Sequence, residues 1–336
     1  MNCERILLEH GGGGLLSNEL ISRLFLPILR NPYLEGLEDG AVFPLGQARC
    51  CLSTDSYVVK PLFFPGGDIG SLAVHGTVND LAMCGARPLF LTAGFIIEEG
   101  FPMDDLERVT RSMAEAARRA GVQVVTGDTK VVNRGAADGL YINSAGLGII
   151  EYPEPISVKS ILPGDVVIIN GPIGNHGAAI LSRREELHLS SEIRSDSAPL
   201  NGLVARILAA TPRIHCMRDA TRGGLGAILA EIAIQSGLEI TVDEERIPVG
   251  DDVRGICEIL GFDPLFLANE GKAAVFCPAD DAEKVLAAMH DDEQGREAVV
   301  IGSVTRKSRG RLILKTSIGG MREVDLPTGE LVPRIC

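Results

Sequence analysis

Val78-Asn79-Asp80-Leu81-Ala82-Met83 is an apolar stretch with one carboxylate in its middle. Apolar residues recur three and four positions apart from Ile69 to Cys84, which predicts a helix, and Gly85 ends it before Pro88. Aspartate is a poor helix former, so a charge at this place needs a partner. Hard oxygen ligands spaced far apart in sequence are those that Mg²⁺ uses where it bridges nucleotide phosphates. Asp80 therefore predicts a metal or phosphate site.

Strands and helices alternate on both sides of this helix, which predicts an α/β protein. The prolines in Glu151–Pro155 and the turn Leu162–Asp165 divide the pattern in two. We therefore expect a glycine-rich segment and helix at 1–36, domains at 37–153 and 154–317, and a tail at 318–336. The expected helices are Leu15–Arg30, Ile69–Cys84, Asp104–Ala120, Gly177–Glu186, Pro199–Ala210, Gly223–Gln235, Asp252–Leu260 and Ala282–His290, and the expected strands are Ala48–Val59, Leu89–Ile97 (buried), Val122–Thr129, Gly139–Ile150, Val166–Asn170, Ile214–Met217, Glu239–Val242, Ala273–Cys277 and segments near Val299 and Leu312.

Composition excludes several classes of protein. The chain has 336 residues, 45 acidic against 32 basic side chains, a net charge of −13, no Trp and 4% aromatic residues. Neither a cationic field nor stacking platforms are present, so we expect no nucleic acid partner. A nucleotide would have to be held by metal ions or backbone N–H groups. The longest apolar run, Pro88–Ile97, is too short for a membrane span, and early charges exclude a signal peptide, so a cytoplasmic protein is expected.

The cysteines form no metal or disulfide pattern. There is no C-x-x-C or H-x-x-x-H spacing, so most of these thiols are expected to be buried and reduced. The last residue, Cys336, is different because no chain follows it. It lies at the end of a tail that begins near Ile318, and about 15 extended residues reach on the order of 50 Å. Prenylation requires a cysteine four residues from the end, whereas a tethered thiol can carry a substrate covalently. The eight cysteines are Cys3, Cys50, Cys51, Cys84, Cys216, Cys257, Cys277 and Cys336.

The sequence lacks a P-loop and a dinucleotide fingerprint. It offers instead four aspartates on predicted strands, on a helix or beside glycine-rich turns. Any one of them is more often a turn former or an N-cap than a ligand. The four are Asp55, Asp80, Asp128 and Asp219.

Four loops have both a plain and a functional interpretation. Pro65–Gly70 is a helix start with Asp68 as N-cap, or a phosphate site made by exposed N–H groups. Gly171–Gly177 is a tight loop, or a substrate cradle with His176 as a polar contact. Asn269–Lys272 is a surface turn, or a general base beside a phosphate ligand. Gly11–Gly14 is a flexible linker, or a segment that closes over a nucleotide.

Taken together, these motifs resemble the superfamily of aminoimidazole ribonucleotide (AIR) synthetase, selenophosphate synthetase and thiamine-monophosphate kinase. The resemblance implies a two-domain AIR synthetase-like (PurM-like) fold, with an N-terminal ATP-binding domain whose sheet pairs in a homodimer, a C-terminal α/β domain and a flexible tail. It also implies ATP held with several Mg²⁺ ions at acidic residues. The motifs are Thr54-Asp55-Ser56, Val78–Met83 with Gly85-Ala86 and Pro88, Gly127-Asp128-Thr129 and Arg218-Asp219-Ala220-Thr221.

Within this superfamily, Pro65–Gly70, Asn269–Lys272 and the terminal Pro333-Arg334-Ile335-Cys336 resemble the HypE family of hydrogenase maturation factors. That resemblance implies that the terminal cysteine accepts a carbamoyl group from the carbamoyltransferase HypF. An ATP-dependent dehydration then converts the thiocarboxamide to a thiocyanate. The cyanide passes to iron on the HypC–HypD scaffold for [NiFe]-hydrogenase.

The same resemblance assigns roles to single residues. It makes Cys336 the carrier and Glu270 the candidate base, with His176 beside the reaction. The four aspartates are implied as magnesium or phosphate ligands. Thr126 and Asn175 depart from the family pattern, where glycine and aspartate are expected. The implied nucleotide-binding residues are Gly66, Gly67, Asn79, Lys130, Asn175 and Lys272.

Two alternatives remain open. One is a small-molecule kinase or synthetase of the same superfamily in which the terminal cysteine is incidental. The other is a non-catalytic scaffold that uses ATP as a structural ligand.

Overall fold

The computed structural model describes residues 5–7, 10–12, 14–184, 192–307, 309–327, 329, 332 and 334–336. Parts of the sequence-based predictions lie outside these residues. They are Cys3, Gly13, Pro333 and the last two residues of the helix expected at Gly177–Glu186.

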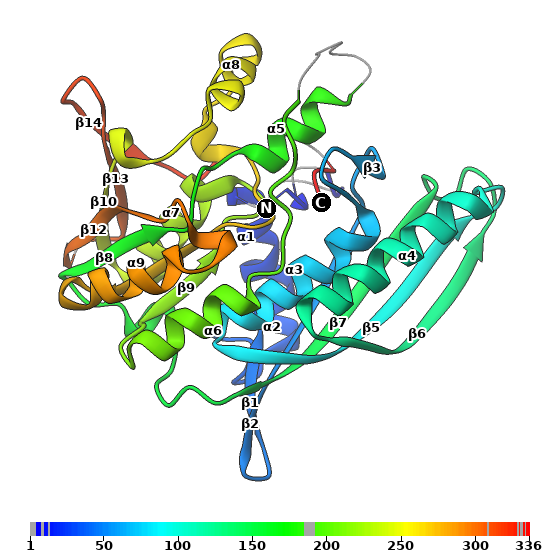
Figure 1. Cartoon of the computed structure of the whole chain (residues 1–336), viewed down its shortest axis with the longest axis horizontal. Helices are drawn as coiled ribbons and strands as arrows, with labels where there is room; N and C mark the ends of the chain where they lie inside the picture. Colours follow the sequence, from blue (N-terminus) through cyan, green and yellow to red (C-terminus); the bar gives the residue numbers. More distant parts are fainter. Residues whose placement is uncertain are drawn as a thin grey trace.

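The N-terminal domain is a five-stranded sheet with helices on one face (Figure 1). Its strand order is β1-β2-β7-β5-β6, and the neighbours are antiparallel except for the parallel pair β5–β6. Helices α3 and α4 pack over one face, and the short strands β3 and β4 precede α3. The elements are β1 (Ala41–Leu45), β2 (Ala48–Tyr57), β3 (Phe63–Phe64), β4 (Gly67–Asp68), α3 (Ile69–Met83), β5 (Ala86–Glu98), α4 (Met103–Ala120), β6 (Gln123–Val132) and β7 (Leu140–Ile150).

The other face of this sheet is exposed, which corrects the expectation of a buried strand at Leu89–Ile97. Side chains alternate along β5, so Leu91 and Ala93 are buried under the helices while Phe90 and Ile96 are over 40% exposed. A continuous apolar run does not reveal this half-exposure. The exposed apolar side chains on this open face include Leu52, Phe90 and Ile96.

Helix α3 begins at a capping box. Asp68 Oδ1 accepts hydrogen bonds from the backbone N–H groups of Gly70 (2.8 Å) and Ser71 (3.1 Å), and Ser71 Oγ accepts one from the Asp68 N–H (3.0 Å). The N-cap interpretation of Asp68 is therefore correct.

The C-terminal domain is a seven-stranded sheet between two helix layers. Its strand order is β14-β13-β10-β12-β8-β11-β9. Helix α7 packs on one face, and α6 and α9 share a core with the other face. The elements are β8 (Asp165–Ile169), α5 (Asn175–Ser182), α6 (Asn201–Ala210), β9 (Cys216–Asp219), α7 (Gly224–Ser236), β10 (Leu238–Asp243), α8 (Asp251–Leu260), β11 (Ala273–Pro278), α9 (Ala282–His290), β12 (Val299–Lys307), β13 (Arg311–Lys315) and β14 (Met321–Val324).

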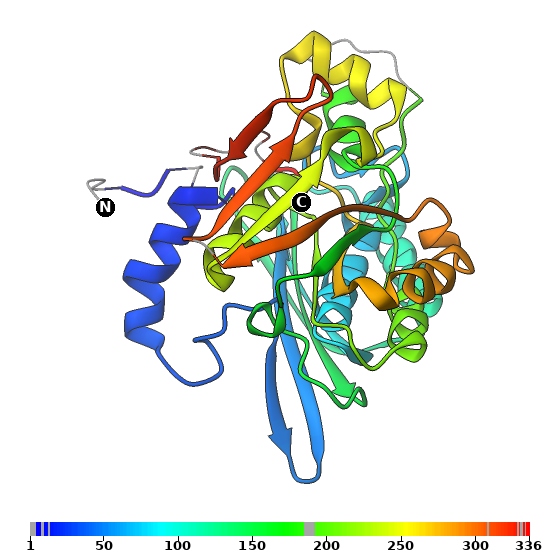
Figure 2. The same ribbon diagram turned by 90° about the vertical axis from the view of Figure 1, so that its left-hand side faces the viewer.

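Four strands differ from the sequence-based expectation: the two-residue strands β3 and β4 were not predicted, and neither were β1 and β14. Strand β14 lies in the segment expected to have little regular structure, where it pairs antiparallel with β13. Strand β1 was not predicted, and it forms with β2 a hairpin that projects from the body in Figure 2. Both strands gain their stability from pairing with a neighbour rather than from a strong local pattern.

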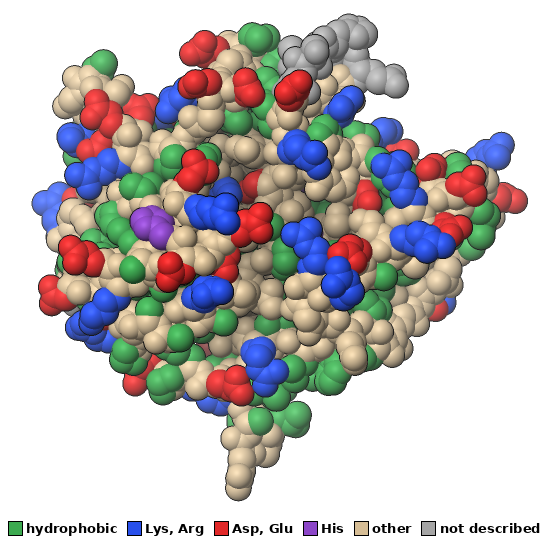
Figure 3. All heavy atoms as spheres, in the orientation of Figure 1, with side chains coloured by type: hydrophobic (Ala, Val, Ile, Leu, Met, Phe, Trp, Pro, Cys, Tyr) green, Lys and Arg blue, Asp and Glu red, His purple; other side chains and the backbone are tan. Residues whose placement is uncertain are grey.

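The expected N-terminal helix Leu15–Arg30 is present as three consecutive segments, α1 (Gly14–Leu20), the π-helix η2 (Ile21–Phe25) and α2 (Leu26–Leu29). In Figure 2 these segments run alongside the body of the molecule. None of the described helices is long and apolar enough to cross a bilayer. Acidic and basic side chains are interspersed over the face drawn in Figure 3.

Candidate active site

Four of the singled-out residues and the terminal cysteine line one cavity of about 570 Å³ between the two domains. Asp55 comes from β2, Asp80 from α3, Asp219 from the end of β9, and Glu270 from the loop before β11. Cys336 lines the same cavity. The fold thus brings together side chains that are up to 281 positions apart in the sequence.

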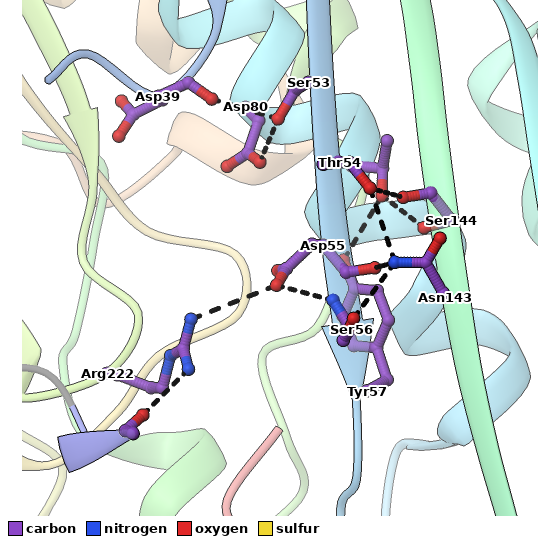
Figure 4. Close-up of polar contacts among 12 residues, drawn as sticks. Asp39, Ser53, Thr54, Asp55, Ser56, Tyr57, Asp80, Asn143, Ser144 and Arg222 are labelled. Atoms are coloured by element: carbon purple, nitrogen blue, oxygen red, sulfur yellow. Dashed lines mark hydrogen bonds and ion pairs between the residues drawn. The ribbon is translucent and has the colours of Figure 1, made fainter. Parts of the chain in front are cut away.

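Asp80 has the partner that its position in an apolar helix required. Ser53 Oγ donates a hydrogen bond to Asp80 Oδ2 at 2.7 Å. Figure 4 shows this pair, with Asp39 nearby and Asp55 pointing from β2 toward Arg222.

The carboxyl groups of this cavity destabilise one another's charged forms. Burial, followed by the charge of Asp39, raises the pKa of Asp219 to about 8. Burial likewise raises the pKa of Asp39 to about 6, although the Arg218 guanidinium opposes that shift. The pKa values of Asp80 and Glu270 lie well above their usual range, first because of burial and next because of Asp219. A bound cation would relieve this repulsion.

The donor atoms fit Mg²⁺ shared with phosphates. Among the buried side-chain atoms, Asp219 Oδ2 and Glu270 Oε1 have no hydrogen-bond partner. Within the described residues, no three His, Cys, Asp or Glu side chains are grouped so as to hold a metal alone. Mg²⁺ bound by one or two carboxylates plus nucleotide phosphates needs no such group.

Sequence reasoning missed five charged residues that line this cavity, which are Glu38, Asp39, Arg218, Arg222 and Glu231. Arg218 Nη1 lies 2.7 Å from Asp39 Oδ1, and both side chains are largely buried. Arg222 donates a hydrogen bond to the Gly11 carbonyl (3.0 Å) and lies 3.9 Å from Asp55 Oδ1. Arg218 stands inside the motif that contains Asp219, and Arg222 directly follows it. Asp39 had only a Glu-Asp-Gly sequence around it, which reads as a turn.

The glycine-rich segment and the tail both reach this cavity. Gly11 lines it, so the interpretation of Gly11–Gly14 as a segment beside a ligand is compatible with the structure. His176 is fully buried, and burial lowers its pKa, so the ring is neutral. Its Nε2 therefore donates to the Ile335 carbonyl (2.7 Å), while Nδ1 accepts from Ser195 Oγ (2.8 Å). His176 thus holds the residue before Cys336.

Asp128 and Lys130 lie apart from the other predicted site residues within one chain. They form an ion pair (2.6 Å) on the exposed strand β6, because that strand is the edge of the N-terminal sheet. Asp128 lines a larger hollow of about 1110 Å³ between α4 and β6. The clustered carboxylates rather than the greater volume mark the chemical site.

The other predicted nucleotide-binding residues are not among those that line the carboxylate cavity. Gly66 has a left-handed φ of 98°, and a Cβ there would come within 2.8 Å of the Ser195 carbonyl oxygen. Asn79 is buried, and it bonds the backbone of Ala198, Leu200 and Glu270. Its contacts hold the two domains together. The remaining members of this set are Gly67, Asn175 and Lys272.

Comparison with known proteins identifies the fold. Residues 37–150 match the family model of the AIR synthase related protein N-terminal domain, and residues 163–315 match that of its C-terminal domain. A structure of an Aquifex aeolicus thiamine monophosphate kinase aligns with a TM-score of 0.68 over 93% of this chain and 99% of that one, at 18% identity. This chain thus shares its fold with a protein of low sequence identity.

Relatives with higher identity cover nearly the whole chain. The carbamoyl dehydratase HypE of Azotobacter vinelandii is 53% identical over 98% of this chain and 96% of its own. The carbamoyl dehydratase HypE of Escherichia coli K12 is 47% identical over 98% of this chain and 99% of its own. A crystal structure of a HypE–HypF complex aligns with a TM-score of 0.87 at 49% identity over 92% of this chain and 99% of that one. A crystal structure of HypE in complex with ATP aligns with a TM-score of 0.83 at 48% identity over 99% of this chain and 100% of that one.

The near-complete coverage, the two AIR synthase related domains and the terminal cysteine beside the carboxylate cluster lead to one conclusion: this chain belongs to the HypE family.

Proposed function

We propose that this protein is an ATP-dependent carbamoyl dehydratase of [NiFe]-hydrogenase maturation. It converts an S-carbamoyl group on Cys336 to a thiocyanate and so supplies the cyanide ligand of the hydrogenase iron. The position of Cys336 carries the proposal, because the last residue of the chain lines the same cavity as Asp80, Asp219 and Glu270. The names of relatives that are about half identical support it.

Dehydration of the carbamoyl group requires an oxygen that can leave. Transfer of the ATP γ-phosphoryl group to the carbamoyl oxygen provides it, and phosphate then departs as the C≡N bond forms and nitrogen loses two protons. The products are the thiocyanate, ADP, phosphate and one net proton. Bound Mg²⁺ would neutralise charge on the phosphoryl group that is transferred, and Asp55, Asp80 and Asp219 are the residues that would hold it.

Glu270 is the candidate base for the nitrogen protons. It is 3% exposed, its Oε1 has no hydrogen-bond partner, and its pKa is raised chiefly by burial. A carboxylate whose pKa is raised is a stronger base than an ordinary glutamate. His176 acts as a positioning residue in this scheme, because it contacts the Ile335 carbonyl rather than the thiol.

A homodimer formed through the open face of the N-terminal sheet would complete the site. The exposed apolar side chains of Leu52, Phe90 and Ile96 on this face would be buried in such an interface. Asp128 and Lys130 on β6 could then serve a nucleotide across the interface, with Lys130 meeting a phosphate. In this scheme HypF supplies the carbamoyl group, the HypC–HypD complex receives the cyanide, and both steps take place in the cytoplasm.

Intact-mass analysis tests the proposal. We expect carbamoyl phosphate, HypF and ATP to add one carboxamide to this protein, and ATP with Mg²⁺ to remove one water from it. Cys336→Ser should show neither change. Product formation on a free small molecule by that variant would instead favour the kinase or synthetase alternative.

A further inference from the structure

The last three residues are hydrogen-bonded to the chain segment that follows β2. The Val58 N–H donates to the Cys336 carbonyl (3.0 Å), and the Lys60 N–H donates to the Arg334 carbonyl (3.1 Å). Ile335 between them is 4% exposed. These bonds place Cys336 in the carboxylate cavity.

The Arg334 side chain adds a polar clamp. Its Nε donates to the Val58 carbonyl (2.9 Å), and its Nη1 pairs with Asp138 Oδ2. Lys60 Nζ bonds the same carboxylate oxygen at 3.0 Å. The guanidinium also lies over the Tyr141 ring, 5.8 Å from its centroid. Asp138 thus joins the tail to the segment on which the tail is seated.

The Arg334 backbone depends on this clamp. Its φ of 54° lies in the left-handed region, which is uncommon for a residue with a side chain. Such a conformation persists where surrounding contacts hold it, and in this tail those contacts are the side-chain contacts of Arg334 together with the backbone bonds from Val58 and Lys60.

Two steps of the proposed reaction place opposite demands on this tail. Dehydration requires Cys336 in the cavity, whereas carbamoylation requires that the thiol reach a separate enzyme. With Ile335 buried and its carbonyl bonded to His176, the seated tail leaves Cys336 only partly exposed, inside the carboxylate cavity. The tail must therefore leave its seat and return.

We propose that Asp138 is a positioning residue that clamps Arg334 and Lys60 and thereby sets the balance between the seated and released tail. The expected effects on carbamoylation and dehydration rest on the proposed function, whereas the contacts of Asp138 with Arg334 and Lys60 do not. Asp138→Asn weakens both ion pairs and leaves the cavity residues unchanged. A partly exposed pair of this kind shifts an equilibrium by about fivefold.

The first test measures seating without any catalysis. Cys336 of the full-length protein is alkylated with iodoacetamide in the absence of nucleotide, and the C-terminal peptide is quantified by mass spectrometry. A protease other than trypsin is needed, because trypsin cleaves after Arg334. The six other cysteines of the described chain are buried and should react slowly. We expect alkylation of Asp138→Asn to be about fivefold faster than that of the unchanged protein.

The second test separates the two half-reactions in single-turnover experiments. Asp138→Asn should accept the carbamoyl group from HypF faster and lose water more slowly after ATP and Mg²⁺ are added. Lys60→Gln removes one of the two cationic partners of Asp138. It should also speed carbamoylation and slow water loss, with smaller changes than those of Asp138→Asn. A general loss of folding would slow both steps. Asp104→Asn, an exposed aspartate in the first turn of α4, is the matched control.

An unchanged rate of Cys336 alkylation in Asp138→Asn would overturn the clamp, whatever the activity shows. Slower carbamoylation in that variant would also contradict it. If the unchanged protein accepts no carbamoyl group, the proposed function fails, but the alkylation rates still decide whether Asp138 seats the tail.

Discussion

Replacing Asp219 with asparagine should stabilise the metal-free protein while it abolishes ATP-dependent chemistry. Asp219 is 7% exposed, and its Oδ2 has no hydrogen-bond partner. Burial and the charge of Asp39 raise its pKa to about 8. A group with this environment opposes folding when it is ionised, so its removal should favour the folded state.

The sign follows from the proton balance. The folded state holds the Asp219 proton up to pH 8, whereas the unfolded chain releases it near pH 4. The folded state therefore binds more protons between these pH values, and the stability of the unchanged protein falls as pH rises through that window. Below pH 4 both states are protonated and Asp219 has no effect.

The magnitude follows from the same shift. A change from 3.8 to about 8 corresponds to roughly 6 kcal/mol at most, at about 1.4 kcal/mol per pKa unit. The asparagine amide must also be desolvated, at about 1–3 kcal/mol when it lacks a partner. We expect a net gain of about 3 kcal/mol at pH 8 and almost none at pH 4.

Thermal unfolding in a chelator at pH 4, 6 and 8 measures this difference, and Asp104→Asn is again the surface control. A gain of about 3 kcal/mol raises the midpoint by roughly 6–12 °C in a domain of this size. Added Mg²⁺ and ATP should stabilise the unchanged protein and have less effect on the variant. Equal or lower stability of Asp219→Asn at pH 8 would refute the account of a strained carboxylate cluster.

Two further predictions concern neighbouring residues. Glu270→Gln should still accept a carbamoyl group on Cys336, but intact mass should show water loss slowed by about 100-fold or more, since the base is gone; a normal rate would assign the base elsewhere. Asn79→Ala leaves the backbone groups of Ala198, Leu200 and Glu270 without their partner. Urea unfolding should show a loss of about 2–4 kcal/mol, and a change under 0.5 kcal/mol would contradict the interdomain role.

Much of the fold is predictable because its elements have strong local patterns. Helix α3 carries apolar residues at helical spacing and a capping box, and α4 ends at Gly121 in the left-handed conformation. Strand β14 has no such pattern, and it is held by antiparallel pairing with β13, the strand just before it. The exposure of one face of β5 could not be predicted either, because a run of apolar residues does not show whether other elements pack on both faces of the strand.

Some residues of the candidate site can likewise be predicted from the sequence, and others cannot. Asp80 is visible in sequence, because a carboxylate in an apolar helix conflicts with its surroundings. Asp39 is not, because its sequence is that of an ordinary turn and only the fold brings it to Arg218. Asp128 carries a clear motif, yet the structure places it on another face of the chain.

By itself the sequence determined the α/β class, the acidic residues that suit a metal-bound nucleotide, and the position of the thiol at Cys336, because these depend on residue type and local spacing. Only the tertiary structure decided which carboxylates meet, how far burial raises their pKa values, and where the tail is seated. Those properties depend on distances between groups far apart in the chain. The clamp of Asp138 on Arg334 is one of them, since 196 positions separate its two partners.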